Sequence, residues 1–289
     1  MRKTVILHIG LPKTGTSFIQ HTFHANKEYL AGKQILYPVI GSDSCFADPG
    51  HHLLAFDLFK YRRQDVADCY ADALVGNIWA RVTDEIIASD CEVAFLSSEV
   101  FALHNCYAEE IQRIRAELEQ FDVHLVVALR DINDFIESFY RQNIHTGFVG
   151  SIEDLAAEHW DNLDWRRLVN FWTENLLPKK LHILEYNEQT KCNWLEYVVS
   201  NIFPGRFSCD DLVQAHINTA SISYELALYI LELNKSGVIN DNSFVNDVVE
   251  FVRSRNVKTE KSDVFLSKNL SVILAKHCKW PEKSENEWV

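Results

Sequence analysis

A glycine-bracketed loop near the N-terminus carries the residues best suited to chemistry. It runs Gly10-Leu11-Pro12-Lys13-Thr14-Gly15-Thr16-Ser17, after an apolar run at 5–9 and before a segment with apolar residues at helical spacing. The pattern predicts a strand, a sharp turn at the two glycines, and a helix. The first N–H groups of a helix lack partners within the helix and lie at the positive end of its dipole, so they bind anions. We therefore predict a phosphate-binding loop at 10–18, to which the hydroxyls of Thr16 and Ser17 contribute.

The spacing of the loop invites comparison with the nucleotide triphosphatase pattern G-x-x-x-x-G-K-[ST]. Gly10 and Gly15 have the required spacing, but Thr16 stands where the lysine belongs, and the loop's lysine is Lys13. One interpretation is a kinase or other nucleotide phosphotransferase in which Lys13, with magnesium, does the work of the missing lysine. The simplest alternative is a turn that joins a strand to a helix and binds nothing.

A second candidate phosphate site follows the most apolar predicted strand, 123–129. Arg130 leaves the end of that strand, and Ser138 lies eight residues on, about two turns into a helix predicted at 132–145. An arginine fork with a hydroxyl can hold a phosphate monoester. The alternative is a surface arginine paired with Asp131 or Asp134.

Polar residues also end the predicted strand 92–99, which closes on Ser97-Ser98-Glu99. His51 and His52 follow a Pro-Gly turn and could act as metal ligands, as bases, or in an acceptor pocket. Adjacent residues do not share a helix face, and no third ligand stands at useful spacing, so a metal site is disfavoured. Surface or capping histidines are the remaining interpretation.

These motifs together resemble the sulfotransferase family. The run Pro12-Lys13-Thr14-Gly15-Thr16-Ser17 looks like the loop that holds the 5′-phosphosulfate of the donor, 3′-phosphoadenosine 5′-phosphosulfate. Arg130 and Ser138 resemble the family's 3′-phosphate motif, with Ile132 in place of its usual proline. The opening Leu7-His8-Ile9-Gly10-Leu11-Pro12-Lys13 is similar to that of bacterial members.

The resemblance implies a role for each matching residue. Donor binding falls on Lys13, Thr14, Gly15, Thr16, Ser17, Phe18, Arg130, Ser138 and Tyr186. Within this set, Phe18 would stack on adenine and Lys13 would also neutralise the leaving group. Glu99 stands where family members carry the catalytic base, and His52 is its rival. The family needs no metal, and its acceptors suggest a carbohydrate hydroxyl. A non-catalytic nucleotide-binding protein is a further alternative.

Apolar strands that alternate with helices predict an α/β fold with a parallel sheet covered on both faces, which the family resemblance makes P-loop-like. Ligands bind at the carboxyl ends of the strands in such sheets. With 289 residues and no linker, we predict one domain over 1–289, with an α/β nucleotide-binding core at 1–205 and a helical C-terminal part at 206–289. Helices are expected at 16–31, 53–89 (as two), 107–120, 132–145, 151–176, 194–202, 221–236, 243–254 and 263–278.

The overall composition limits which kinds of partner and which location are expected. A net charge of −13 argues against general nucleic-acid binding, which needs a basic face. No stretch approaches the roughly 18 apolar residues of a membrane span, and no leader is evident, so a cytoplasmic protein is expected. The seven cysteines form no C-x-x-C pair, which predicts buried free thiols rather than disulfides or a zinc site.

Overall fold

The chain divides into two compact units in a computed structural model that describes residues 2–42, 49–61, 63–103, 107–215, 222–237 and 265–281. The first unit comprises Met1–Arg130, Trp165–Ile217 and Pro281–Val289, and the second comprises Asp131–Asp164 and Asn218–Trp280. The helix predicted at 243–254 lies outside the described residues.

The apolar runs of the first unit form a five-stranded sheet. Its strands are β1 (Thr4–His8), β2 (Ile35–Leu36), β3 (Val93–Ser97), β4 (Asp122–Arg130) and β5 (Lys180–Tyr186). They stand in the order β2-β3-β1-β4-β5, and every pairing is parallel. The predicted α/β class with a parallel sheet is confirmed.

The central position of β1 decides where its loop lies. His8, its last residue, is opposite Ser97 of β3 on one side and Val126 of β4 on the other. Chain connections leave β1 toward β2 and β3, and β4 then pairs on the opposite side, so the strand order reverses beside β1. In open parallel sheets, the crevice at such a reversal is where ligands bind.

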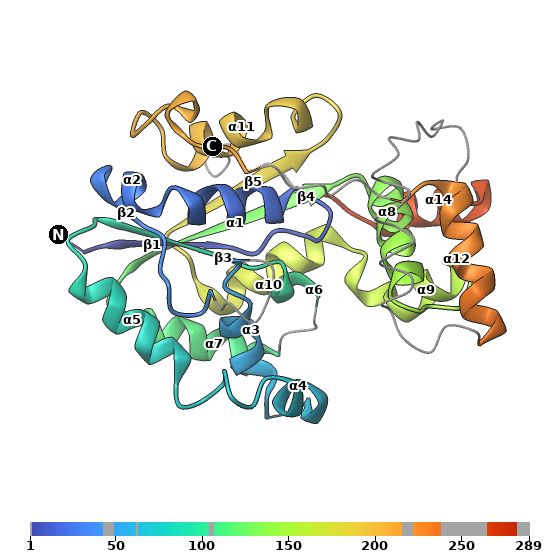
Figure 1. Cartoon of the computed structure of the whole chain (residues 1–289), viewed down its shortest axis with the longest axis horizontal. Helices are drawn as coiled ribbons and strands as arrows, with labels where there is room; N and C mark the ends of the chain where they lie inside the picture. The colour runs from blue at the N-terminus through green and yellow to red at the C-terminus, as the bar shows by residue number, and fades with distance from the viewer. Residues whose placement is uncertain are drawn as a thin grey trace. The chain divides into compact units, whose positions relative to one another are not determined.

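Helices cover both faces of the sheet (Figure 1). One face carries α1 (Thr16–Ala25), α2 (Lys27–Gly32) and α11 (Trp194–Ile202). The other carries α3 (His52–Phe59), α5 (Ile78–Ala88), α7 (Ala108–Glu117) and α10 (Trp165–Leu176), with the short helices α4 (Gln64–Cys69) and α6 (Val100–Leu103) beside them. Short 3-10 turns occur at η2 (Lys191–Asn193) and η3 (Cys209–Asp211).

The core beneath α1 and α11 is aromatic and aliphatic. Phe23 of α1 lies fully buried with its ring centroid 4.9 Å from that of Phe95 on β3 and 5.8 Å from that of Phe203. Ile19 and Trp194 join the same cluster. Burying large side chains of this kind contributes roughly 1.5–3 kcal/mol each, so this packing fixes α1, and with it the start of the loop, against the sheet.

Several predicted helices are interrupted. The helix predicted over 16–31 breaks at Asn26, whose side-chain amide donates to the carbonyl of Thr22 and exchanges hydrogen bonds with the backbone of Val213. The segment 53–89 contains α3, α4 and α5 rather than two helices, and 151–176 contains α9 (Ile152–Glu158), η1 (Trp160–Asn162) and α10. Apolar spacing continued across these breaks and so concealed them.

The elements of the second unit that the structure describes are helices. This unit contains α8 (Ile132–His145), α9, η1, α12 (Tyr224–Ser236) and α14 (Lys268–His277), and the predicted bounds of α8 are confirmed. Asp131 caps α8 by accepting from the N–H groups of Asn133 and Asp134. Farther along α8, the Glu137 carboxylate accepts from the backbone N–H groups of Phe265 and Leu266.

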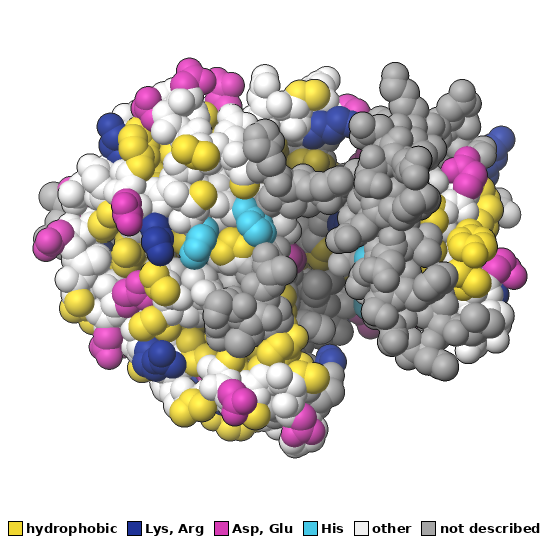
Figure 2. Space-filling model, viewed as in Figure 1, with side chains coloured by type: hydrophobic (Ala, Val, Ile, Leu, Met, Phe, Trp, Pro, Cys, Tyr) yellow, Lys and Arg dark blue, Asp and Glu magenta, His cyan; other side chains and the backbone are white. Residues whose placement is uncertain are grey.

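Charged side chains of both signs are interspersed on the face drawn in Figure 2. No helix in the described part of the chain is long and apolar enough to cross a membrane.

The described cysteines are free thiols: Cys91 and Cys278 are buried as predicted, whereas Cys69 and Cys192 are exposed, which corrects the expectation for these two. Cys45 and Cys106 lie outside the described residues.

Candidate functional site

The loop after β1 is a sharp turn held by its own residues and by β4. The N–H groups of Ile9 and Leu11 donate to the carbonyls of Val126 and Ala128, at 2.9 and 3.0 Å, so the chain keeps its pairing with β4 as it leaves the strand. The Thr14 hydroxyl donates to the Leu11 carbonyl at 2.6 Å and closes the turn. These bonds hold the loop in a fixed conformation at the carboxyl end of the sheet.

Two residues of the loop have left-handed backbone conformations. Lys13 has φ 64° and Gly15 has φ 72°. Glycine adopts this region freely, but for lysine it is uncommon, and such conformations gather at functional sites. The surrounding hydrogen bonds therefore hold Lys13 in a conformation that its side chain does not favour.

The start of α1 is open to an anion. Gly15 occupies its N-cap, no side chain caps the helix, and its first turn has no acidic residue. The first N–H groups of a helix lack intrahelical partners, and the helix dipole is positive there. This end of α1 can therefore hold a phosphate or sulfate group, as the spacing predicts.

Close packing requires both glycines of the loop. A Cβ at Gly10 would lie 2.8 Å from His8 Nε2 and from Thr16 Cγ2. A Cβ at Gly15 would lie 2.8 Å from Trp194 Cδ1 and 3.2 Å from Tyr186 Cε2. Cβ atoms rarely lie this close to other atoms, so a side chain at either position would require the neighbouring rings or Thr16 to move.

Arg130 reaches the loop from the end of β4. Its Nη1 donates to the Lys13 carbonyl at 3.1 Å. Its guanidinium carbon lies 5.7 Å from the ring centroid of Tyr186, the residue opposite it on β5. The indole N–H of Trp165 donates to the Arg130 carbonyl. Thus Arg130, Lys13 and Tyr186, picked out separately in the sequence, lie together.

An aromatic group flanks this side of the loop. The rings of Tyr186 and Trp194 meet edge to face with centroids 5.0 Å apart. The Trp194 indole nitrogen is buried and has no hydrogen-bond partner among the described residues. Phe18 is half-buried and packs against the core under α1, as Tyr186 also does in part. The stacking of Phe18 on adenine and the place of Tyr186 near the nucleotide stay predictions.

Ser138 belongs to the second unit. It lies on α8 and is buried. Its predicted partnership with Arg130 in one clamp stays a prediction.

On the other side of β1, the end of β3 presents Ser98 and Glu99 beside His52. The Ser98 hydroxyl accepts from the Val100 N–H at 3.2 Å and lies 2.8 Å from His52 Nδ1. Glu99 is partly exposed, whereas His52 is buried. The two candidate bases are therefore linked through Ser98, which contacts His52, the first residue of α3, and precedes Glu99 in the chain.

His51 has a structural role that differs from its neighbour's. Its Nδ1 accepts from the Ser97 N–H at 3.1 Å, and its Nε2 lies 3.0 Å from the Pro38 carbonyl. Burial lowers the pKa of His51 to about 4, so it bridges these groups as a neutral ring. The interpretation of His51 and His52 as surface residues is wrong, because both are buried.

Gln20, His8 and Trp194 were not predicted as site residues. Gln20 lies on α1 with its side-chain amide 3.0 Å from Glu99 Oε2 and 3.2 Å from Ser97 Oγ. His8 ends β1, and its Nδ1 lies 2.8 Å from the same hydroxyl. A polar residue on the apolar stripe of a helix, beside Ile19 and Phe23, is the signal by which Gln20 could have been found.

The tryptophans considered as a sugar platform have other surroundings. Trp165 and Trp172 are fully buried in the core, which confirms the core interpretation for them. Trp160, in the second unit, stacks on His277 with ring centroids 3.9 Å apart.

No protein-family model matches the chain, and no curated protein matches it with significance.

Proposed function

We propose that the chain is a sulfotransferase that moves a sulfuryl group from 3′-phosphoadenosine 5′-phosphosulfate to a hydroxyl group, with a carbohydrate as the acceptor. One observation carries the proposal: Arg130 at the end of β4 is hydrogen-bonded to the strained Lys13 of the loop after β1. The bond joins the Arg130 side chain to the backbone of Lys13, so two basic residues lie at the carboxyl end of the sheet in a chain whose net charge is −13. A polyanionic donor needs such a local concentration of positive charge.

The donor would bind along the carboxyl end of the sheet. Its 5′-phosphosulfate would lie on the N–H groups of residues 13–18 at the start of α1, and its 3′-phosphate on Arg130. Tyr186 would lie beside the nucleotide and Phe18 beside its adenine. The strand order and the loop's place after the central strand support a P-loop-like core, and α12 and α14 support a helical C-terminal part.

The reaction is an in-line displacement at sulfur. The Glu99 carboxylate takes the proton of the acceptor hydroxyl, whose oxygen forms a bond to sulfur. The bond from sulfur to the bridging oxygen of the donor breaks, and adenosine 3′,5′-bisphosphate leaves. Lys13 neutralises the charge that develops on that oxygen. Catalysis of this kind rests on positioning and electrostatic stabilisation, as in phosphoryl transfer.

Calorimetry tests which nucleotide the protein binds. We expect adenosine 3′,5′-bisphosphate to bind in EDTA, and Arg130→Ala to weaken its Kd by roughly 10- to 100-fold, because a charge-assisted hydrogen bond contributes about 1.5–3 kcal/mol. Arg206→Ala is the matched control, since Arg206 pairs with Glu92 on the surface. Binding of ATP that requires magnesium would instead favour the phosphotransferase interpretation, which the spacing of Gly10 and Gly15 suggests.

Transfer assays test the chemistry. With labelled donor and a panel of glycans, lipids and phenols, Lys13→Ala should lose about 100-fold or more in kcat, whereas the exposed Lys33→Ala should not. Glu99→Gln should lose a similar factor. Full activity of Glu99→Gln together with an inactive His52→Ala would move the base to His52. Retained bisphosphate binding with no transfer across the panel would favour a non-catalytic binding protein.

A further inference from the structure

We infer that Gln20 is a positioning residue that holds the Glu99 carboxylate in the orientation needed to take the acceptor's proton. The inference rests on the proposed function. It begins from a buried amide on the helix that starts at the phosphate-binding loop. Gln20 is fully buried and lies one helical turn beyond Thr16, about 6 Å along the axis at 1.5 Å per residue.

The contacts of Gln20 settle which way its amide points. Nε2 lies 3.0 Å from Glu99 Oε2, 3.2 Å from Ser97 Oγ and 3.4 Å from the Ser97 carbonyl. A carboxylate and a carbonyl can only accept, so the group that faces them must be the NH2 group. One of its hydrogens therefore reaches Glu99 and the other reaches the end of β3.

The same orientation leaves Oε1 of Gln20 buried with no hydrogen-bond partner in the described part of the chain. A buried acceptor without a partner is unfavourable. A leucine or methionine at this position would avoid that penalty, among neighbours such as Ile19 and Phe23 that are apolar and buried. The amide therefore serves its donor contacts rather than the packing of α1.

These contacts join the candidate base to the loop. Glu99, Gln20, Ser97 and His8 form a continuous polar chain, because Ser97 Oγ lies 2.8 Å from His8 Nδ1 at the end of β1. With Oε2 held by Gln20, the other carboxylate oxygen of Glu99 is the one left to accept a proton. Since Gln20 and the anion-binding end belong to one rigid helix, the distance from the base to the sulfuryl group is set by α1.

The first arm of the test needs no activity. In the full chain labelled with ¹⁵N-glutamine, the Gln20 side-chain resonance is assigned by its loss in Gln20→Met. We expect Glu99→Gln to shift that resonance and to speed its exchange with water, whereas Glu92→Gln on the surface leaves it unchanged. A Gln20 resonance that does not respond to Glu99→Gln overturns the inference.

The second arm measures transfer. Gln20→Met keeps the volume of the side chain but removes both donors, and should lower kcat by about 10- to 100-fold while the acceptor KM and the Kd of adenosine 3′,5′-bisphosphate stay within about twofold. Thr22→Val, a buried change on the same helix whose hydroxyl accepts from the Ala215 N–H, should leave kcat unchanged. A kcat of Gln20→Met within twofold of wild type overturns the inference. If the wild-type protein neither binds the bisphosphate nor transfers sulfuryl groups, the proposed function fails, and the first arm alone decides whether Gln20 holds Glu99.

Discussion

Two features favour glycine at position 15: its backbone conformation and the close packing around it. Its φ of 72° favours glycine, and the position of its missing Cβ is filled by the Trp194 ring at 2.8 Å. Gly205 has nearly the same φ, 71°, but nothing lies within 4 Å of a Cβ there. The pair separates conformational strain from steric exclusion at the loop.

We expect Gly205→Ala to lower the free energy of unfolding by about 1 kcal/mol, the strain of a left-handed alanine. Gly15→Ala should lose about 3 kcal/mol, because overpacking against Trp194 adds to that strain. It should also weaken bisphosphate binding, since the loop must shift. Urea denaturation and calorimetry measure the two effects. Equal losses of stability in the two variants would show that Trp194 yields to the methyl group.

At the residue scale, the sequence points most directly to candidate residues at the ends of strands. Lys13, Glu99 and Arg130 follow apolar runs, and an apolar run marks where a strand ends. Gln20 and Trp194 meet the site through contacts between distant segments; Gln20 and Glu99 are 79 residues apart. Contacts of this kind come from the packing of α1 and α11 on the sheet, which local spacing does not encode.

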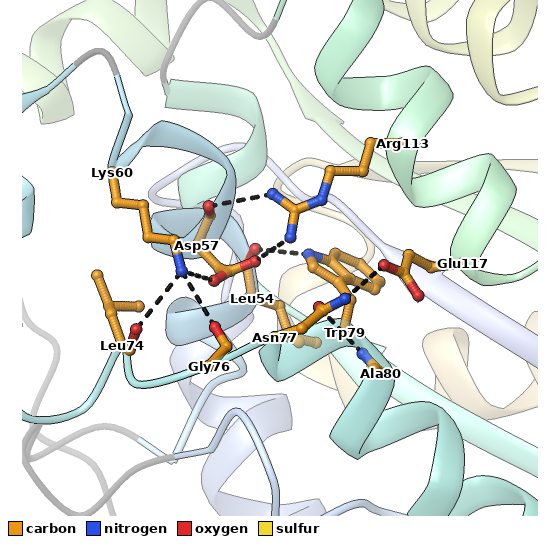
Figure 3. Close-up of polar contacts among 10 residues, drawn as sticks. All are labelled: Leu54, Asp57, Lys60, Leu74, Gly76, Asn77, Trp79, Ala80, Arg113 and Glu117. Carbon is orange, nitrogen blue, oxygen red and sulfur yellow. Dashed lines mark hydrogen bonds and ion pairs between the residues drawn. The ribbon is translucent and has the colours of Figure 1, made fainter.

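Among the elements, α3 is tied to its neighbours by a buried aspartate (Figure 3). Asp57 is fully buried, and its carboxylate accepts from Lys60 at 2.6 Å and from Arg113 of α7 at 2.7 Å. Lys60 also donates to the carbonyls of Leu74 and Gly76. Two cations thus neutralise one buried charge and join α3, the segment before α5, and α7.

Removing the charge of Asp57 should lower the stability of the folded protein substantially. Asp57→Asn leaves both cations without their counter-ion, and we expect a loss of about 3 kcal/mol in the free energy of unfolding. Asp122→Asn breaks the pair with the exposed Lys179 and should change stability by less than about 1 kcal/mol. Urea titrations of both variants provide the measurement. A loss at Asp57 no larger than that at Asp122 would mean that solvent replaces the carboxylate.

The bounds of some helices follow from the local sequence, whereas those of others depend on contacts with distant segments. The bounds of α8 and α11 agree with the prediction, because each begins and ends near a change in polarity. The break between α1 and α2 does not interrupt the apolar spacing. It arises where Asn26 bonds to Val213, far along the chain. The sheet order likewise depends on long-range pairing, although the parallel class was predictable from continuous apolar strands.

For the molecule as a whole, buried histidines imply sensitivity to acid. Burial lowers the pKa values of His8, His51 and His182 to about 4. Between pH 6.5 and 4 the unfolded chain binds protons at these sites and the folded chain does not, so stability falls as the pH falls through this range. Each histidine contributes about 1.4 kcal/mol per pH unit there.

His182 allows this dependence to be tested on its own. Both of its ring nitrogens are buried without hydrogen-bond partners among the described residues, so His182→Leu removes a titrating group and no hydrogen bond. At pH 7 its free energy of unfolding should equal or exceed that of wild type. Its loss of stability between pH 7 and pH 5 should be smaller by about 2 kcal/mol.

The control for this prediction is His51→Leu. It also removes a titrating group, but it takes away the contacts with Pro38 and Ser97, so it should already be destabilised at pH 7. Urea denaturation at pH 7, 6 and 5 for the three proteins gives the slopes. If His182→Leu loses stability with acid as steeply as wild type, then His182 is protonated in the folded protein over this range. The acid response would in that case belong to the other histidines whose pKa burial lowers, among them His8 and His51 beside the candidate site.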